Sequence, residues 1–181
     1  MKIAFSGKIC SGKTTAANWL LANVPGMVRL SFATRLKELA TELFDMREKD
    51  RKLLQDLGAA LRAIDGNVWV RAFERQVRQC ESLGQSVVVD DLRFRNEYNC
   101  LRDLGFTIIR LEVPPDVQLL RLRQTYPTTY EAHLARIRDP SEIDLDDAHW
   151  DHSVGNPEDL DVLLRILIGY QPVYGNGDTQ N

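Results

Sequence analysis

A glycine-rich stretch near the start of the chain, Gly7–Thr15, holds the residues best suited to chemistry. Its sequence GKICSGKT matches the pattern G-x-x-x-x-G-K-[ST], with a strand-like segment before it and a helix-like segment after it. The glycines allow successive backbone N–H groups to face one point, and the N-terminus of the following helix adds positive potential there. A turn that contains glycine and lysine by chance is the alternative, but the flanking segments favour a phosphate-binding loop.

Such a loop predicts ATP as a phosphate donor. We expect Lys13 to reach the β- and γ-phosphates and the Thr14 hydroxyl to coordinate Mg²⁺, the predicted cofactor. The predicted phosphate-binding residues are Gly7, Lys8, Cys10, Ser11, Gly12, Lys13, Thr14 and Thr15.

Two adjacent acids, Asp90 and Asp91, follow a continuous β-branched run that begins at Ser86. Such a run is typical of a central strand buried on both faces. In P-loop proteins an acid at the end of such a strand lies across from the loop and holds Mg²⁺. Adjacent side chains point in different directions, so we expect one of the two acids to face the metal, and the spacing does not say which. A solvated pair of acids in a turn is the alternative.

Arg93 and Arg95 come directly after these acids. A guanidinium group presents a planar fork to phosphate oxygens and stays charged, so arginines beside a metal-binding carboxylate suit a site for two phosphate groups. Surface ion pairs with Glu97 or Glu112 are the alternative.

A polar segment, 124–140, is the candidate for a lid over the nucleotide. Arg121, Arg123 and Arg136 lie beside it or within it, and a closing lid would bring arginines onto the transferred phosphoryl group and exclude water. Arg121 and Arg123 are two positions apart on a predicted helix, so they cannot both face one ligand. The alternative is an ordinary pair of charged helices.

The elements that must position these residues alternate between strands and helices, which predicts an α/β fold with a parallel five-stranded sheet and right-handed crossovers. The predicted strands are Lys2–Ser6, Met27–Phe32, Ser86–Asp90, Phe106–Val113 and, more weakly, Asp151–Val154. Thr34, Asp50 and Asn156 are candidate helix caps. We expect one domain over 1–170, with a helical lobe at 34–84 and the lid at 124–140 as insertions, and a frayed tail at 171–181.

The composition of the chain limits the classes of partner that we expect the protein to bind. The chain has 181 residues and a net charge of −3, so it lacks the basic excess expected of a protein that binds nucleic acid polymers. No apolar stretch has the length of a membrane span or a signal peptide. The three cysteines, Cys10, Cys80 and Cys100, have no metal-binding spacing and suggest free thiols in a reducing compartment. We therefore expect a cytoplasmic protein.

Over roughly residues 1–168 the chain resembles the bacteriophage deoxynucleoside monophosphate kinases, a branch of the nucleoside monophosphate kinase-like P-loop enzymes. The matching residues are the loop GKICSGKTT, Ser31-Phe32-Ala33 with Leu36-Lys37-Glu38, Leu53-Leu54-Gln55 with Leu57-Gly58 and Arg62, Trp69-Val70, Asp91–Glu97, Ser141-Glu142 and Asp151–Asn156. Arg95 stands where such proteins often have proline.

The resemblance implies a P-loop kinase fold with a helical acceptor-binding lobe and a short lid. It also implies transfer of the ATP γ-phosphate to a deoxynucleoside monophosphate, giving the diphosphate and ADP, in the host cytoplasm if the protein is phage-encoded. A phosphate acceptor is already anionic, so positioning and charge neutralisation suffice. A homodimer is one assembly to test.

Under this interpretation Lys13, Arg93 and Asp91 are the catalytic residues. The predicted acceptor-binding residues are Phe32, Arg35, Lys37, Gln55, Arg62, Trp69 and Arg93. Gln55 would read a base edge or simply lie on a helix surface, and Trp69 would serve the acceptor or pack the lobe.

Two other functions fit the loop. One is a P-loop kinase for a hydroxyl acceptor, such as dephospho-coenzyme A or a small sugar acid, with Asp90 or Asp91 as general base. The other is a nucleotide-dependent switch that hydrolyses ATP slowly without transferring phosphate, although such a protein usually borrows an arginine or carries one.

Overall fold

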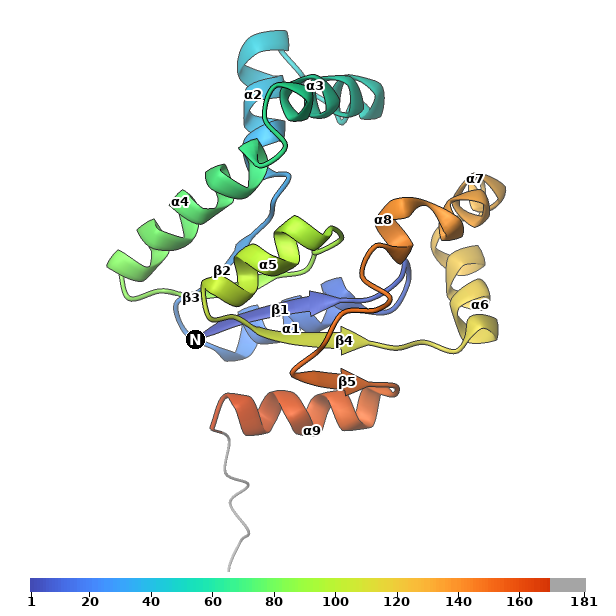
Figure 1. The fold of residues 1–181 in the computed structure, drawn as a ribbon. Coiled ribbons are helices and arrows are strands. Elements are labelled where there is room, and N and C mark those ends of the chain that lie inside the picture. The colour runs from blue at the N-terminus through green and yellow to red at the C-terminus, as the bar shows by residue number, and fades with distance from the viewer. Residues whose placement is uncertain (170–181) are drawn as a thin grey trace, which may run out of the picture.

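Within residues 1–169, which the computed structural model describes apart from the side chains of residues 51, 136, 138, 140 and 141, five parallel strands form a sheet in the order β2-β3-β1-β4-β5 (Figure 1). The strands are β1 (Lys2–Ser6), β2 (Met27–Leu30), β3 (Ser86–Val89), β4 (Thr107–Leu111) and β5 (His152–Val154). The predicted α/β fold with a five-stranded parallel sheet is confirmed, and all but β1 are shorter than predicted. The predicted tail, 171–181, lies outside the described residues.

Helices connect the strands and cover both faces of the sheet. They are α1 (Lys13–Asn23), α2 (Thr34–Phe44), α3 (Arg51–Ile64), α4 (Val68–Ser82), α5 (Arg95–Asp103), α6 (Pro115–Thr125), α7 (Tyr130–Leu134), the 3₁₀ helix η1 (Ala135–Arg138), α8 (Pro140–Ile143) and α9 (Pro157–Leu167). The segment predicted as a lid is therefore largely helical, as part of α6 followed by α7, η1 and the start of α8.

Side-chain alternation along β1 separates two hydrophobic clusters. Ile3 and Phe5 pack with Leu20 of α1 and Leu164 of α9 on one face. On the other face, Ala4 of β1 and Val87 and Val89 of β3 pack with residues of two helices. These are Phe73 and Val77 of α4 and Leu101 of α5. Because both faces are covered, the central strands are apolar throughout, as expected for a parallel sheet.

The excursion between β2 and β3 forms a lobe of three helices, of which α2 and α3 extend away from the sheet in Figure 1. Asp50 caps α3 by accepting a hydrogen bond from Leu53 N (3.0 Å), as predicted. Thr34 was expected to cap α2, but this is wrong, because Ala33 occupies the cap position and makes no side-chain cap. The indole of Trp69 on α4 donates to the Gly58 carbonyl on α3 (3.3 Å) and joins the two helices.

All strands run in the same direction, so the loops that follow them meet at one edge of the sheet. The phosphate loop follows β1, which lies between β3 and β4. The pair Asp90-Asp91 follows β3 directly and therefore lies beside the loop. In open α/β sheets, ligands bind at this carboxyl edge.

Phe73 offers a test of the core between α4 and the sheet. Its side chain is 1% exposed and stacks on Phe32 with ring centroids 4.0 Å apart. We expect Phe73→Ala to lower the free energy of unfolding by about 3–5 kcal/mol, because the substitution leaves a cavity. Urea denaturation measures this change.

The matched control is Phe44→Ala, since Phe44 at the end of α2 is 55% exposed. Its expected cost is within about 0.5 kcal/mol. Equal effects of the two substitutions would contradict this description of the core.

Candidate functional site

The phosphate loop needs glycine at both ends. Gly7 has φ 148° and Gly12 has φ 101°, conformations that residues with a Cβ rarely adopt. A Cβ on Gly7 would lie 2.5 Å from Ser11 Oγ and 2.6 Å from the Leu111 carbonyl oxygen. Between them Cys10 also has a positive φ, 63°. The loop is thus tightly curled, and it leads directly into the N-terminus of α1.

Lys13 bends back over its own loop. Its Nζ donates to the carbonyl oxygens of Gly7 (2.5 Å) and Lys8 (2.8 Å). Burial and, to a lesser extent, the positive charge of Arg93 lower the pKa of Lys13 to about 8. An anion beside this ammonium group would offset both effects, so the site favours a negatively charged ligand.

A cavity of about 780 Å³ lies along one flank of the loop. The cavity is lined by four segments of the chain. These are residues 10–15 of the loop and α1, residues 111–114 at the end of β4, residues 117, 121 and 124–126 of α6 and the turn after it, and residues 154–157 and 160 from the end of β5 into α9. Arg121 lines it and donates to the Cys10 carbonyl oxygen (3.3 Å). Arg123 instead lies over the ring of Tyr130, 4.9 Å from its centroid. The two arginines diverge, as their spacing predicted.

Asp90 and Asp91 point to different parts of the site. Asp91 is turned toward the segment after β2, where it accepts from Ser31 Oγ (2.5 Å) and, at longer range, from the N–H groups of Phe32 (3.4 Å) and Ala33 (3.5 Å). Burial raises the pKa of Asp91. Asp90 is 12% exposed and lies 3.8 Å from Arg29 Nε.

The charge of Asp90 also raises the pKa of Lys13, which places it near the loop. Asp90 is therefore the acid on the loop side, and Asp91 ties the end of β3 to the start of the lobe.

Arg93 lies at the other flank of the loop. Its Nη1 forms an ion pair with Glu142 Oε1 (2.5 Å), and its backbone N–H donates to Glu97 Oε2 (2.9 Å). Arg95 points elsewhere, with its backbone N–H on Asp144 (2.7 Å) and its guanidinium paired with Asp147. Of Arg93 and Arg95, only Arg93 pairs with a group that also contacts the loop, since Glu142 accepts from Ile9 N (2.6 Å).

Sequence and structure both show similarity to known proteins. No family model matches the chain. An uncharacterized protein of Ictalurid herpesvirus 1, ORF77, is 32% identical over 115 residues, which are 62% of this chain and 50% of that protein. The chain thus spans half the length of this relative. A protein of Acanthamoeba polyphaga mimivirus named "Putative deoxynucleotide monophosphate kinase" is 27% identical over 143 residues, covering 62% of this chain and 74% of that protein.

Among solved structures, the dephospho-CoA kinase of Campylobacter jejuni superposes with a TM-score of 0.52 at 22% identity, covering 94% of this chain and 100% of that one. The chain has the fold of the P-loop kinases. The predicted fold is confirmed by this likeness and by the strand order, whereas the phage origin stays a prediction.

Apart from Arg93, the residues predicted to bind an acceptor fall into two groups in this P-loop kinase fold. Phe32 and Trp69 are buried in packing contacts, so they hold the lobe together, and direct contact with an acceptor stays a prediction. The others are exposed on α2 and α3, namely Arg35, Lys37, Gln55 and Arg62. Among the described residues, no hydrogen bond or ion pair links these four side chains to the phosphate loop. The side chain of Arg136 lies outside the described residues.

Two buried polar residues beside the loop were missed by the sequence analysis. Arg110 on β4 is 7% exposed, donates to Ser6 Oγ (3.3 Å) and lowers the pKa of Lys13. Gln118 on α6 donates to the Ile9 carbonyl oxygen (2.9 Å). An arginine inside an otherwise apolar strand was the available signal for Arg110. Gln118 gave none, because a glutamine on a predicted helix usually faces solvent.

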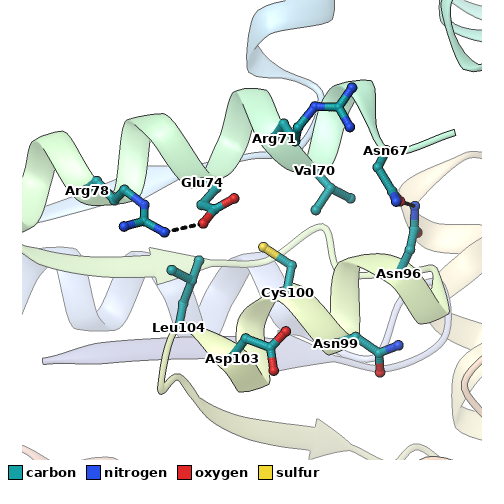
Figure 2. A pocket seen from close by; sticks show the side chains of 10 residues that line it. All are labelled: Asn67, Val70, Arg71, Glu74, Arg78, Asn96, Asn99, Cys100, Asp103 and Leu104. Atoms are coloured by element: carbon teal, nitrogen blue, oxygen red, sulfur yellow. Dashed lines mark hydrogen bonds and ion pairs between the residues drawn. The ribbon is translucent and has the colours of Figure 1, made fainter. Parts of the chain in front are cut away.

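A second cavity, of about 420 Å³, lies between α4 and α5 (Figure 2). Glu74 and Arg78 form an ion pair on its α4 side, and Cys100 faces it from α5. Burial raises the pKa of Cys100 to about 11, and the charge of Glu74 contributes. None of the predicted site residues lines this cavity.

In the part of the chain that the structure describes, no helix is both long and apolar enough to cross a membrane.

Glu97 makes the stability of the site pH-dependent. Its carboxylate accepts from the N–H groups of Arg93 (2.9 Å) and Phe94 (3.1 Å), yet burial raises its pKa from 4.5 to about 7. Between these pH values the folded protein holds more protons on Glu97 than the unfolded chain does. The free energy of unfolding that this carboxyl contributes is therefore fully present below pH 4.5 and is lost as the pH rises toward about 7.

We expect Glu97→Gln to flatten the fall in unfolding free energy across pH 4.5 to 7, by at most about 1.4 kcal/mol per pH unit. Urea denaturation at a series of pH values measures the slope. Glu131→Gln, on the exposed surface of α7, is the control and should keep the wild-type slope. An unchanged slope in Glu97→Gln would show that Glu97 is not the source of the pH dependence of the unfolding free energy.

Proposed function

We propose that the protein transfers the terminal phosphate of ATP to a deoxynucleoside monophosphate, giving the diphosphate and ADP. The observation that carries the proposal is the position of Arg93, whose charge reaches Lys13 and whose guanidinium lies on the flank of the loop opposite the 780 Å³ cavity. This arrangement suits a donor held in the cavity and an acceptor phosphate held by Arg93. The similarity to the mimivirus protein supports the same acceptor class.

The loop side of the proposed site would hold the donor. The N–H groups of the loop would cradle its phosphates, and Lys13 would turn from its own loop carbonyls to the phosphate oxygens. The buried Ser11 hydroxyl has no hydrogen-bond partner among the described residues, and it would donate a hydrogen bond to a phosphate oxygen. Arg121 would lie beside the nucleotide in the cavity.

Thr14 and Asp90 fit a magnesium ion, because a hydroxyl and a carboxylate are the oxygen ligands that Mg²⁺ prefers. Thr14 is exposed at the start of α1, and Asp90 lies on the loop side of β3. When bound, Mg²⁺ would neutralise charge on the donor phosphates. In this proposal Asp91 acts on the lobe rather than on the metal, since its hydrogen bonds fix the segment that leads into α2.

The acceptor side would be completed by the lobe. Arg35 and Arg62 are exposed on α2 and α3, and closure of the lobe toward the sheet would bring such side chains to the phosphate held by Arg93. Closure would also exclude water, which competes with the acceptor for the phosphoryl group. The lid residues and Arg121 would approach from the donor side.

A hydroxyl acceptor is the second candidate, and one feature favours it. Asp91 is a buried carboxyl with a raised pKa at the carboxyl edge of the sheet, as a general base often is. The likeness to a dephospho-CoA kinase gives the fold in which such a reaction occurs, without naming the acceptor here.

The test is a coupled assay of ADP formation with ATP and Mg²⁺. The acceptors are the four common deoxynucleoside monophosphates, the ribonucleotides, dephospho-coenzyme A and small sugar acids. We expect phosphate transfer to at least one deoxynucleoside monophosphate and, in Lys13→Met, a loss of turnover by several orders of magnitude with the fold intact. Transfer only to an alcohol would replace the proposal with the second candidate, and phosphate release without any acceptor would indicate a switch.

The two acids provide a matched pair of substitutions. We expect Asp90→Asn to raise the Mg²⁺ concentration for half-maximal rate by about 10–100-fold, because a carboxylate near the metal is lost. Asp91→Asn should leave that concentration unchanged and raise the KM for the acceptor. Titration of the initial rate with Mg²⁺ and with the acceptor separates the two effects, and the reverse pattern would assign the metal to Asp91.

A further inference from the structure

A carboxylate lies at the phosphate loop itself. The side chain of Glu142, on α8, is 6% exposed. Its Oε2 accepts from the backbone N–H of Ile9 (2.6 Å), and its Oε1 pairs with Arg93 Nη1 (2.5 Å). Each oxygen of a nearly buried anion is thus held by one donor, and neither donor belongs to the lid.

These two donors are of the kinds that bind phosphoryl oxygens. A backbone N–H of a glycine-rich loop and a guanidinium group are the usual partners of a phosphate in such sites. The charge of Glu142 also raises the pKa of Lys13, so the carboxylate balances the same positive charges that a substrate would meet. Glu142 therefore makes contacts that a phosphate group would make.

The position of Glu142 indicates which end of the substrate it would replace. The cavity on the donor side is lined by the loop from Cys10 onward and includes neither Ile9 nor Arg93. Glu142 thus lies beyond the donor cavity, on the flank of the loop where a terminal phosphate would meet an acceptor.

The segment that follows Glu142 is anchored independently. Asp144 accepts from Arg95 N (2.7 Å), and Asp146 pairs with Arg110 Nη2 (3.1 Å) and Lys8 Nζ (3.5 Å). This hydrogen bond and these ion pairs hold residues 144–146 across the carboxyl edge without using Glu142. The carboxylate can therefore leave its place while the rest of the segment stays attached.

We propose that Glu142 is an internal substitute for a substrate phosphate, and that its carboxylate fills a subsite formed by Ile9 N–H and the Arg93 guanidinium until a phosphoryl group displaces it. The identity of that group as the donor's terminal phosphate or the acceptor's phosphate rests on the proposed function. Two anions cannot share these donors without strong repulsion, so binding of the substrate requires Glu142 to move.

Calorimetric titration of Glu142→Gln tests the exchange, since glutamine keeps the shape and removes the charge. The ligands are a non-hydrolysable ATP analogue with Mg²⁺, ADP with Mg²⁺, and a deoxynucleoside monophosphate. We expect about tenfold or tighter binding of the ligand whose phosphate takes the subsite, with little change for ADP. Tightening of the ATP analogue assigns the subsite to the terminal phosphate, and tightening of the monophosphate assigns it to the acceptor.

Glu81→Gln is the control, because it removes the same charge from an exposed position near the end of α4, beside Lys2 at the start of β1 and away from the loop, and should leave all three affinities unchanged. Unchanged or weaker binding of every ligand to Glu142→Gln would overturn the proposal and make Glu142 a fixed support for Arg93.

Hydrogen exchange on the wild-type protein gives a second measurement that needs no substitution. We expect peptides that cover residues 139–143 to exchange faster when the ATP analogue or the monophosphate is bound, and those that cover 144–148 to stay as they are. Unchanged exchange at 139–143 with both ligands would overturn the displacement. Neither measurement needs turnover, so absence of phosphate transfer would refute the proposed function alone.

Discussion

Positive charge gathered at the carboxyl edge of the sheet is the constraint on which the rest of the site depends. Burial, together with the positive charges of Arg93 and Arg110, lowers the pKa of Lys13 to about 8. Partly buried cations are costly unless anions accompany them. Glu142 and Asp146 supply that balance, so electrostatics hold the segment after α8 across the loop. The chain thus supplies its own counter-ions for the cations at the loop.

Local patterns predicted the loop and the sheet because each depends on neighbouring residues. The glycines at 7 and 12, with Lys13 and Thr14 at fixed spacing, specify a curled loop at the start of a helix. The apolar run after Ser86 predicts a buried strand wherever the rest of the chain lies. Segment 124–140 lacked such a pattern, and short helices stabilised by contacts such as the stack of Tyr126 on His133 decide its form.

The contacts that complete the site join residues far apart in the sequence, and this is why sequence reasoning missed them. Glu142 is 133 positions from Ile9 and 49 from Arg93. Its place in a short helix of polar sequence gave no sign of burial. The roles of Asp90 and Asp91 could not be distinguished for a related reason. The direction of the Asp91 side chain depends on its contact with Ser31, which is 60 positions away in the sequence.

The same charge balance bears on the nature of the acceptor. If the subsite takes the acceptor's phosphate, an acceptor that presents an uncharged hydroxyl there would bring no anion to replace Glu142 at Arg93. A monophosphate would exchange one anion for another and keep the number of buried charges constant. The lobe supports this choice, because Arg62 is exposed on α3 and makes no hydrogen bond or ion pair among the described residues. An acceptor with its own phosphate would give both Arg62 and Arg93 an anionic partner.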